Sequence, residues 1–167
     1  LFLYGVALGL MVRGGIGVAP WDVLALGLAE QTGLRYGVMT VVVSIVVLLL
    51  WIPLRQRVGL GTVLNALIVG PSADLALALI PQPASVWIGA PMFVFGLLLL
   101  SFATGLYIAA DFGPGPRDGL MTGLVRRTGW AVWLVRTLIE GGVLLIGFLL
   151  GGPVGVGTVL FAFGVGP

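Results

Sequence analysis

Long runs of uncharged, apolar residues constrain this chain more than any other feature. The run VVVSIVVLLLWIP (41–53) is one of several, and hydrophobic residues make up 59% of the 167 residues whereas charged residues make up 8%. Soluble domains typically carry about 25% charged residues, so one soluble core is too small to hide this much apolar surface. The runs also lack the alternation of barrel strands. The sequence therefore predicts an all-α polytopic membrane protein.

Six hydrophobic spans can be drawn along the chain. A helix needs about 20 apolar residues to cross a bilayer, and the spans cover 1–12, 36–53, 58–80, 86–110, 130–150 and a last stretch that starts near Val154. The first and last spans are expected to continue beyond the 167 residues, so we interpret the chain as a fragment truncated at both ends.

Two segments between these spans are too short to cross a bilayer. They are WDVLALGLAEQTG (21–33) and RDGLMTGLVRRTG (117–129). At about 1.5 Å per residue, each makes a helix of only three turns or so. We expect both to form short interfacial or re-entrant helices.

The composition excludes several kinds of site. The chain has no Cys and no His, which removes disulfides, thiol nucleophiles, His-based triads and most zinc sites. The net charge of +2 is interpreted as a signal of membrane orientation, not of nucleic-acid binding. We therefore expect no cofactor, no metal and no nucleic-acid partner. We also expect no enzyme, because neither Asp22 nor Asp118 is set in the Gly-x-Gly-Asp pattern of an intramembrane aspartyl pair. The expected partners are the lipid bilayer and a small-molecule substrate, and a homodimer is compatible with the sequence.

The chain also contains an internal duplication. Shifted by 96 residues, positions 1–71 align without a gap on positions 97–167, and polar and glycine positions match in register. The matches are Gly17, Pro20, Asp22, Leu24, Gly27 and Leu28 with Gly113, Pro116, Asp118, Leu120, Gly123 and Leu124, then Thr32-Gly33 with Thr128-Gly129, and VGLGTVLNALIVGP (58–71) with VGVGTVLFAFGVGP (154–167). We predict repeats 1–80 and 86–167 within a single membrane domain, 1–167.

The number of spans predicts the relative orientation of the repeats. Three spans per repeat make two directly joined repeats face opposite ways across the membrane. Arginines support this, since one arrangement places five on the cytoplasmic side and two outside, with Arg136 inside the membrane. The five are Arg55, Arg57, Arg117, Arg126 and Arg127, and the two are Arg13 and Arg35. Two three-span inverted repeats, each with a short helix, are typical of secondary transporters, whose sites lie near the bilayer midplane.

Each repeat carries the same glycine-proline-aspartate turn. The turns comprise Gly17, Pro20 and Asp22 in the first repeat and Gly113, Pro116 and Asp118 in the second. Proline is tolerated in the first turn of a helix, and aspartate can satisfy the unpaired N–H groups there. The turns are expected to start the short helices inside the membrane and to approach each other from opposite faces.

Charges inside a bilayer are costly and by default indicate a functional path. Asp22 and Asp118 can form a symmetric proton or substrate site, or each can cap its short helix or pair with a nearby arginine. Arg136 and Glu140 lie one helical turn apart and share a face, so they can form an ion pair. That pair can bind a charged substrate or gate a proton, or it can neutralise two charges and orient the span.

Two further polar residues are candidates. Asp74 follows Pro71 by three residues, so a kink can open a polar pocket there, or Asp74 can lie nearer the interface and face water. Asn65 can line a cavity or form a hydrogen bond between helices. Both interpretations stay open for each residue.

Four stretches carry a family resemblance. GVAPWDVL, GPGPRDGL, VGLGTVLNALIVGP and VRRTGWAVWLVRTLIEGGVLLIGFLLGG resemble the YczE/YyaS-like bacterial integral membrane proteins, which are grouped with YitT-type proteins. The resemblance covers the whole chain. It implies a multi-pass protein of the bacterial inner, or plasma, membrane, and it assigns no functional residue.

These features favour a secondary transporter or exporter of small molecules. The grounds are the inverted repeats, the paired turns and the charges inside the membrane. One alternative is a non-transporting membrane scaffold, sensor or assembly factor for a biosynthetic system. Another is a small oligomeric channel, whose flux does not depend on a coupling-ion gradient.

Overall fold

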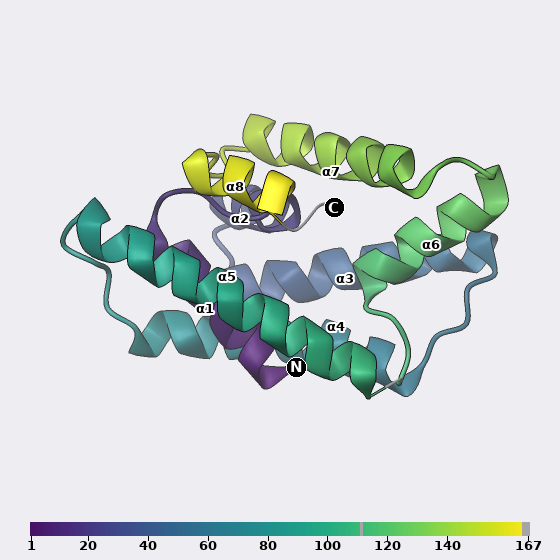
Figure 1. Cartoon of the computed structure of the whole chain (residues 1–167), viewed down its shortest axis with the longest axis horizontal. Coiled ribbons are helices and arrows are strands. Elements are labelled where there is room, and N and C mark those ends of the chain that lie inside the picture. Colours follow the sequence, from purple (N-terminus) through teal and green to yellow (C-terminus); the bar gives the residue numbers. More distant parts are fainter. Residues whose placement is uncertain (111, 165–167) are drawn as a thin grey trace.

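The computed structural model describes residues 1–110 and 112–164. Over these residues the chain forms eight helices and no strand, so the all-α class is confirmed (Figure 1). The helices are α1 (Phe2–Gly14), α2 (Pro20–Thr32), α3 (Tyr36–Leu54), α4 (Leu60–Leu79), α5 (Val86–Ala109), α6 (Pro116–Thr128), α7 (Val132–Leu149) and α8 (Val156–Gly164). Residues 165–167, at the end of the second repeat, lie outside the described residues.

Among the described residues, four helices are long and apolar enough to cross a membrane, namely α3, α4, α5 and α7. Their outer faces carry exposed apolar side chains such as Val46, which is 52% exposed, and this suits contact with lipid. The other two expected spans correspond to α1, with 13 residues, and α8, with nine described residues. Both are shorter than the roughly 20 residues that a bilayer requires.

The two segments expected to be short helices are α2 and α6, with 13 residues each. Each begins at a proline, Pro20 or Pro116, whose missing N–H group costs nothing in the first turn. Each is followed by a glycine in the left-handed conformation, Gly33 with φ 69° and Gly129 with φ 71°. Glycine takes this conformation without strain from a Cβ atom, so both helices stop there.

Three of the helix pairs related by the 96-residue shift start at matching positions, the first being α2 and α6. Tyr36 starts α3 and Val132 starts α7, and Leu60 starts α4 as Val156 starts α8. Figure 1 shows α3 and α7 running in opposite directions along the long axis of the molecule. α3 and α7 therefore start at equivalent positions but run in opposite directions.

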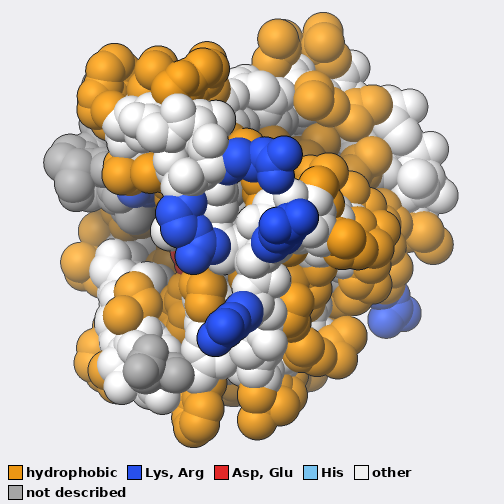
Figure 2. Space-filling model, turned by 90° about the vertical axis from the view of Figure 1, so that its right-hand side faces the viewer, with side chains coloured by type: hydrophobic (Ala, Val, Ile, Leu, Met, Phe, Trp, Pro, Cys, Tyr) orange, Lys and Arg blue, Asp and Glu red, His pale blue; other side chains and the backbone are white. Residues whose placement is uncertain are grey.

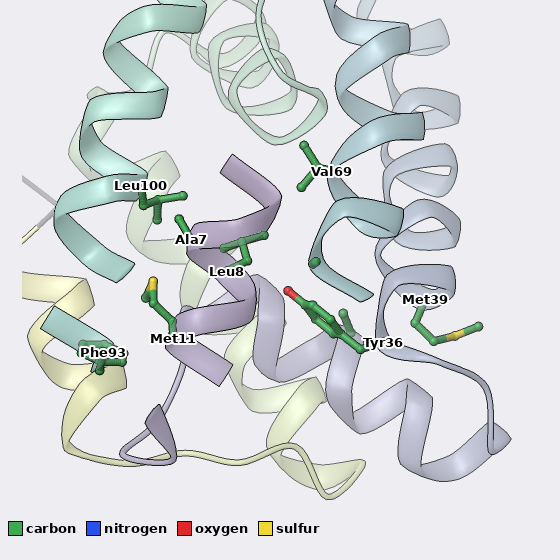
Figure 3. Packing of buried hydrophobic residues seen from close by; sticks show 10 residues of the cluster. Ala7, Leu8, Met11, Tyr36, Met39, Val69, Phe93 and Leu100 are labelled. Atoms are coloured by element: carbon green, nitrogen blue, oxygen red, sulfur yellow. The ribbon is translucent and has the colours of Figure 1, made fainter. Parts of the chain in front are cut away.

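The core is built around α1, which packs between α4 and α5. Small residues bring α1 close to α4, since a Cβ atom added to Gly5 would lie 2.4 Å from the Cβ atom of Ser72. Close backbone approach between small residues is the usual way in which helices associate in lipid. On the side of α5, the buried Met11 of α1 belongs to one cluster with Phe93 and Leu100 (Figure 3).

Arginines gather at one end of the molecule (Figure 2). Arg55 follows α3, and Arg126 and Arg127 close α6 beside it, around one shallow pocket. The guanidinium of Arg127 donates to the carbonyl of Pro53 at 2.8 Å. Arg117 was expected on the same side of the membrane as these arginines. It lies in the first turn of α6, and its side chain pairs with Asp22.

Candidate functional site

The glycine-proline-aspartate turns are sharp and depend on their glycines. Gly17 has φ 120° and Gly113 has φ 108°, backbone conformations that L side chains rarely adopt. Each turn redirects the chain after α1 or α5 and leads into α2 or α6. Both turns therefore favour glycine at these two positions.

The first turn docks on the start of α8, in the other half of the molecule. The backbone N–H of Val18 donates to Oγ1 of Thr158 at 3.2 Å, and the N–H of Gly157 donates to the carbonyl of Ile16 at 2.7 Å. These bonds satisfy backbone groups of a non-helical segment, which lipid alone leaves without partners.

The second turn docks on the start of α4 in the equivalent way. Oγ1 of Thr62 donates to the carbonyl of Pro114 at 2.7 Å, and the N–H of Gly61 donates to the carbonyl of Phe112 at 2.8 Å. A Cβ atom on Gly61 would lie 2.9 Å from that carbonyl oxygen. Each half therefore holds the turn of the other half, and this glycine allows the close approach.

Asp22 lies where the two halves meet. Its Oδ1 accepts a hydrogen bond from Arg117 Nη2 at 3.3 Å and another from the Tyr36 hydroxyl at 3.0 Å, and its side chain is 2% exposed. The expectation that Asp22 caps its own helix was wrong, because the N-cap is Ala19 and no side-chain cap bond forms. The alternative, pairing with an arginine, is what the structure contains.

Arg117 makes a second contact with the first half. Its guanidinium carbon lies 5.4 Å from the centroid of the Trp21 ring, a cation–π distance. Burial by itself lowers the pKa of Arg117, but the Asp22 carboxylate raises that pKa above its ordinary value, so the guanidinium stays charged. Trp21 and Arg117 occupy equivalent positions of the two repeats, so the two turns touch through equivalent residues.

Asp118 has a different environment from its counterpart Asp22. The Tyr107 hydroxyl donates to Asp118 Oδ2, and the Tyr107 ring packs edge-on against Tyr4 with centroids 6.4 Å apart. Among residues 1–110 and 112–164 no arginine lies within ion-pair distance of Asp118. Here too the expected cap is wrong, since the N-cap of α6 is Gly115 and it has no side-chain cap bond.

Arg136 and Glu140 form the ion pair that their spacing predicts. Arg136 Nε lies 2.9 Å from Glu140 Oε1, and the two side chains are 26% and 21% exposed. Both project from α7 into the same cavity as Arg117 and Asp118. Their counterparts in the first repeat, Thr40 and Ser44, carry no charge.

This central cavity has a volume of about 370 Å³. Its charged lining residues are Arg117, Asp118, Arg136 and Glu140, and its aromatic lining residues are Tyr4, Trp21, Tyr107 and Phe161. The lining therefore draws on both halves of the molecule.

A smaller cavity of about 40 Å³ adjoins the central cavity and shares four of its residues, Tyr4, Tyr107, Arg117 and Asp118. Asn65, Thr40 and Ser44 also line it. These three are the repeat counterparts of Phe161, Arg136 and Glu140, so equivalent positions line both cavities. Asn65 thus lines a cavity, as one of its two interpretations held.

Asp74 is not part of this arrangement. Its Oδ1 accepts a hydrogen bond from the backbone N–H of Gly37 at 2.7 Å, in the first turn of α3. It is half-buried and lies beside Arg35 in a separate open pocket. Asp74 therefore satisfies the start of a neighbouring helix, a role that the sequence analysis did not consider.

Sequence reasoning missed Arg117, Tyr36 and Tyr107 as site residues. The available signal was the repeat itself, because position 117 is the counterpart of Trp21 and both precede the aspartates. Comparing every neighbour of the two aspartates between the repeats would have identified Arg117 as a candidate site residue. Among the described residues, no group of three or more acidic side chains is arranged to hold a metal ion.

Comparisons with known proteins identify the family of this chain. Over residues 1–167 the chain matches the model of a family described as "Family of unknown function (DUF6198)". An uncharacterised protein of Haemophilus influenzae is 40% identical over 166 residues, which are 99% of this chain and 76% of that protein. No solved structure matches the chain.

Two Bacillus subtilis proteins confirm the resemblance seen in the sequence. The uncharacterised membrane protein YczE is 29% identical over 163 residues, 97% of this chain and 75% of that protein. The uncharacterised protein YyaS is 27% identical over 169 residues, 96% of this chain and 82% of that protein. The chain therefore belongs to the DUF6198 family and is a YczE/YyaS-like helical membrane protein.

Proposed function

We propose that this protein is a secondary transporter that moves a small molecule across the bacterial plasma membrane. One observation carries the proposal. Of the charged side chains expected inside the membrane, Asp118, Arg136 and Glu140 line one cavity, and Asp22 is joined to it through Arg117. Such charges are expensive in a bilayer and mark substrate or ion pathways.

The architecture that we propose is six spans in two inverted repeats. Three pairs of helices begin 96 residues apart, namely α2 and α6, α3 and α7, and α4 and α8, and α3 and α7 run in opposite directions (Figure 1). Transporters of this architecture bind substrate at the interface between the repeats, near discontinuous helices. The two docked turns, at the starts of α2 and α6, supply such helices beside the central cavity.

The Asp22–Arg117 pair supplies a contact that can change during transport. The pair joins the two halves across the repeat interface at 3.3 Å. In alternating access one repeat rocks against the other around a fixed site. An ion pair at that interface stabilises the arrangement of the two repeats in which it is formed. The pair separates when the repeats rock into the other arrangement.

Access to the cavity from both sides of the membrane tests the proposal. Thr104, half-buried on α5, lines the central cavity, and the chain has no Cys. Thr104→Cys is made in the full-length protein, with any other cysteine replaced. It is then exposed to a membrane-impermeant maleimide in intact cells and in inside-out vesicles. We expect labelling in both preparations, because alternating access opens one site to each side in turn.

Two control variants calibrate this labelling. Arg57→Cys, in an exposed loop, should react in one preparation only, and Val46→Cys, on the apolar outer face of α3, should react in neither. Labelling of Thr104→Cys from one side alone contradicts a transporter and favours a scaffold or sensor. Two-sided labelling together with steady conductance in a planar bilayer favours a channel instead.

A further inference from the structure

We propose that the central cavity binds an amphipathic organic cation, an amine or quaternary ammonium with an apolar body, and that Asp118 is its counter-ion. This inference rests on the proposed function for the direction of movement, and it adds the class of substrate. It follows from the charges, the aromatic side chains and the apolar side chains of the cavity lining.

When Asp22 is counted with the charged lining residues, three carboxylates face two arginines and one carboxylate is left over. Arg117 is matched by Asp22 at 3.3 Å, and Arg136 is matched by Glu140 at 2.9 Å. Asp118 accepts a hydrogen bond from Tyr107, yet within the described part of the chain no arginine pairs with it. A carboxylate facing a cavity inside a membrane is stabilised by an opposite charge. A ligand that compensates the charge of Asp118 must therefore be positively charged.

Aromatic rings line the same cavity as this carboxylate. Tyr4, Trp21, Tyr107 and Phe161 all line the cavity. The Tyr107 hydroxyl is bound to Asp118 and its ring packs on Tyr4, so the carboxylate and two rings are held together. Cations on carbon frameworks are attracted to the faces of such rings, and aromatic cages recognise quaternary ammonium groups in this way.

The other lining residues favour a ligand with an apolar body. Four lining side chains are apolar, namely Ala19, Leu100, Met121 and Ile139. The two hydroxyl residues of the lining, Ser101 and Thr104, donate to carbonyls of their own helix α5, so the walls offer few oxygen ligands to a metal ion. Inorganic cations such as Mg²⁺ and Ca²⁺ need about six or more oxygen ligands. A volume of about 370 Å³ lies within the usual range for small-molecule sites.

Equilibrium dialysis with the purified full-length protein in detergent tests the inference without any transport step. The probe is radiolabelled benzyltrimethylammonium, and the matched compounds are benzenesulfonate, an anion, and benzyl alcohol, which is neutral. We expect the cation to bind about tenfold or more tightly than either compound. Equal or tighter binding of the anion, or no binding of the cation, overturns the inference.

Three variants locate the counter-ion. Asp118→Asn should weaken binding of the cation by about tenfold or more, whereas Asp118→Glu keeps the charge and should retain most of the binding. Glu30→Gln removes an exposed carboxylate of α2 outside the cavity and should leave binding unchanged. If a monodisperse Asp118→Asn protein binds the cation with unchanged affinity, Asp118 is not the counter-ion. If the asparagine variant fails to fold, Asp118→Glu is the variant on which the test depends.

The two proposals fail separately. If the cation binds through Asp118 but Thr104→Cys is labelled from one side only, the cation site stands and transport does not. If Thr104→Cys is labelled from both sides but the cation binds no better than the anion, transport stands and the substrate class is wrong.

Discussion

Arg117 and Asp22 belong to different halves of the chain, and their side chains meet at 3.3 Å where the two turns converge. They are 95 residues apart in sequence. Asp22 is almost fully buried and also accepts the Tyr36 hydroxyl, so its charge depends on Arg117 for compensation. One ion pair therefore joins the repeats at the edge of the central cavity.

Removing one partner of this pair should cost far more stability than removing both. Arg117→Met leaves a buried carboxylate without its cation, and such losses amount to about 3–5 kcal/mol. In the double variant Asp22→Asn with Arg117→Met no charge remains uncompensated, so most of that loss should be recovered. Equilibrium unfolding of the purified protein in mixed SDS micelles measures these free energies.

Glu30→Gln is the control for this series, because Glu30 is exposed and its loss should change stability by less than about 0.5 kcal/mol. A double variant as unstable as Arg117→Met would show that Asp22 and Arg117 act independently, contrary to the structure.

Local signals predicted the elements that carry the site. Pro20 and Pro116 mark the starts of α2 and α6, and Gly33 and Gly129 follow their ends, as the residue types indicate. The pairing of Arg136 with Glu140 also followed from spacing on one helix. These features depend on residues within one or two helical turns, so they can be read directly from the sequence.

Long-range partners could not be predicted in the same way. Asp22 lies two residues after the proline that starts α2 and so suggested a cap, but Tyr36 and Arg117 bind it instead. Asp74 reaches Gly37 across 37 residues. In both cases the packing of helices that are distant in sequence determines the partner. A single sequence does not show that packing.

Gly61→Ala should destabilise the docking of the second turn. The new Cβ atom would lie 2.9 Å from the carbonyl oxygen of Phe112, a backbone atom that cannot move aside alone. Overpacking of this kind costs about 1–3 kcal/mol. Gly105→Ala is the matched control, because nothing lies within 4 Å of its added Cβ atom in α5. It should instead gain about 0.5–1 kcal/mol from helix propensity.

Unfolding in mixed SDS micelles compares these two variants directly. Equal effects from Gly61→Ala and Gly105→Ala would mean that the approach of α4 to the second turn is looser than the structure shows.

The orientation of the repeats should be visible in two single cysteines. Arg57 and Pro153 are exposed and occupy equivalent positions. The neighbouring pair Gln56 and Gly152 is unsuitable, since a Cβ atom on Gly152 would lie 2.1 Å from the carbonyl of Val23. Inverted repeats place Arg57→Cys and Pro153→Cys on opposite sides of the membrane, with Arg57 in the cytoplasm. An impermeant maleimide applied to intact cells should therefore label Pro153→Cys alone, and labelling of both variants or of neither would indicate parallel repeats.

Asp74 should prove to be a structural residue outside the transport path. Its Oδ1 accepts the N–H of Gly37 in the first turn of α3, where Arg35 provides no side-chain cap. Asp74→Ala removes that acceptor and should cost about 0.5–2 kcal/mol, as the loss of an N-cap does, whereas Asp74→Asn keeps an acceptor and should cost less. Asp74 lines neither of the two cavities around Asp118, so benzyltrimethylammonium should bind both variants as it binds the wild type. If Asp74→Asn instead loses cation affinity to the extent expected of Asp118→Asn, then Asp74 belongs to the binding path and the assignment of the cavity must be redrawn.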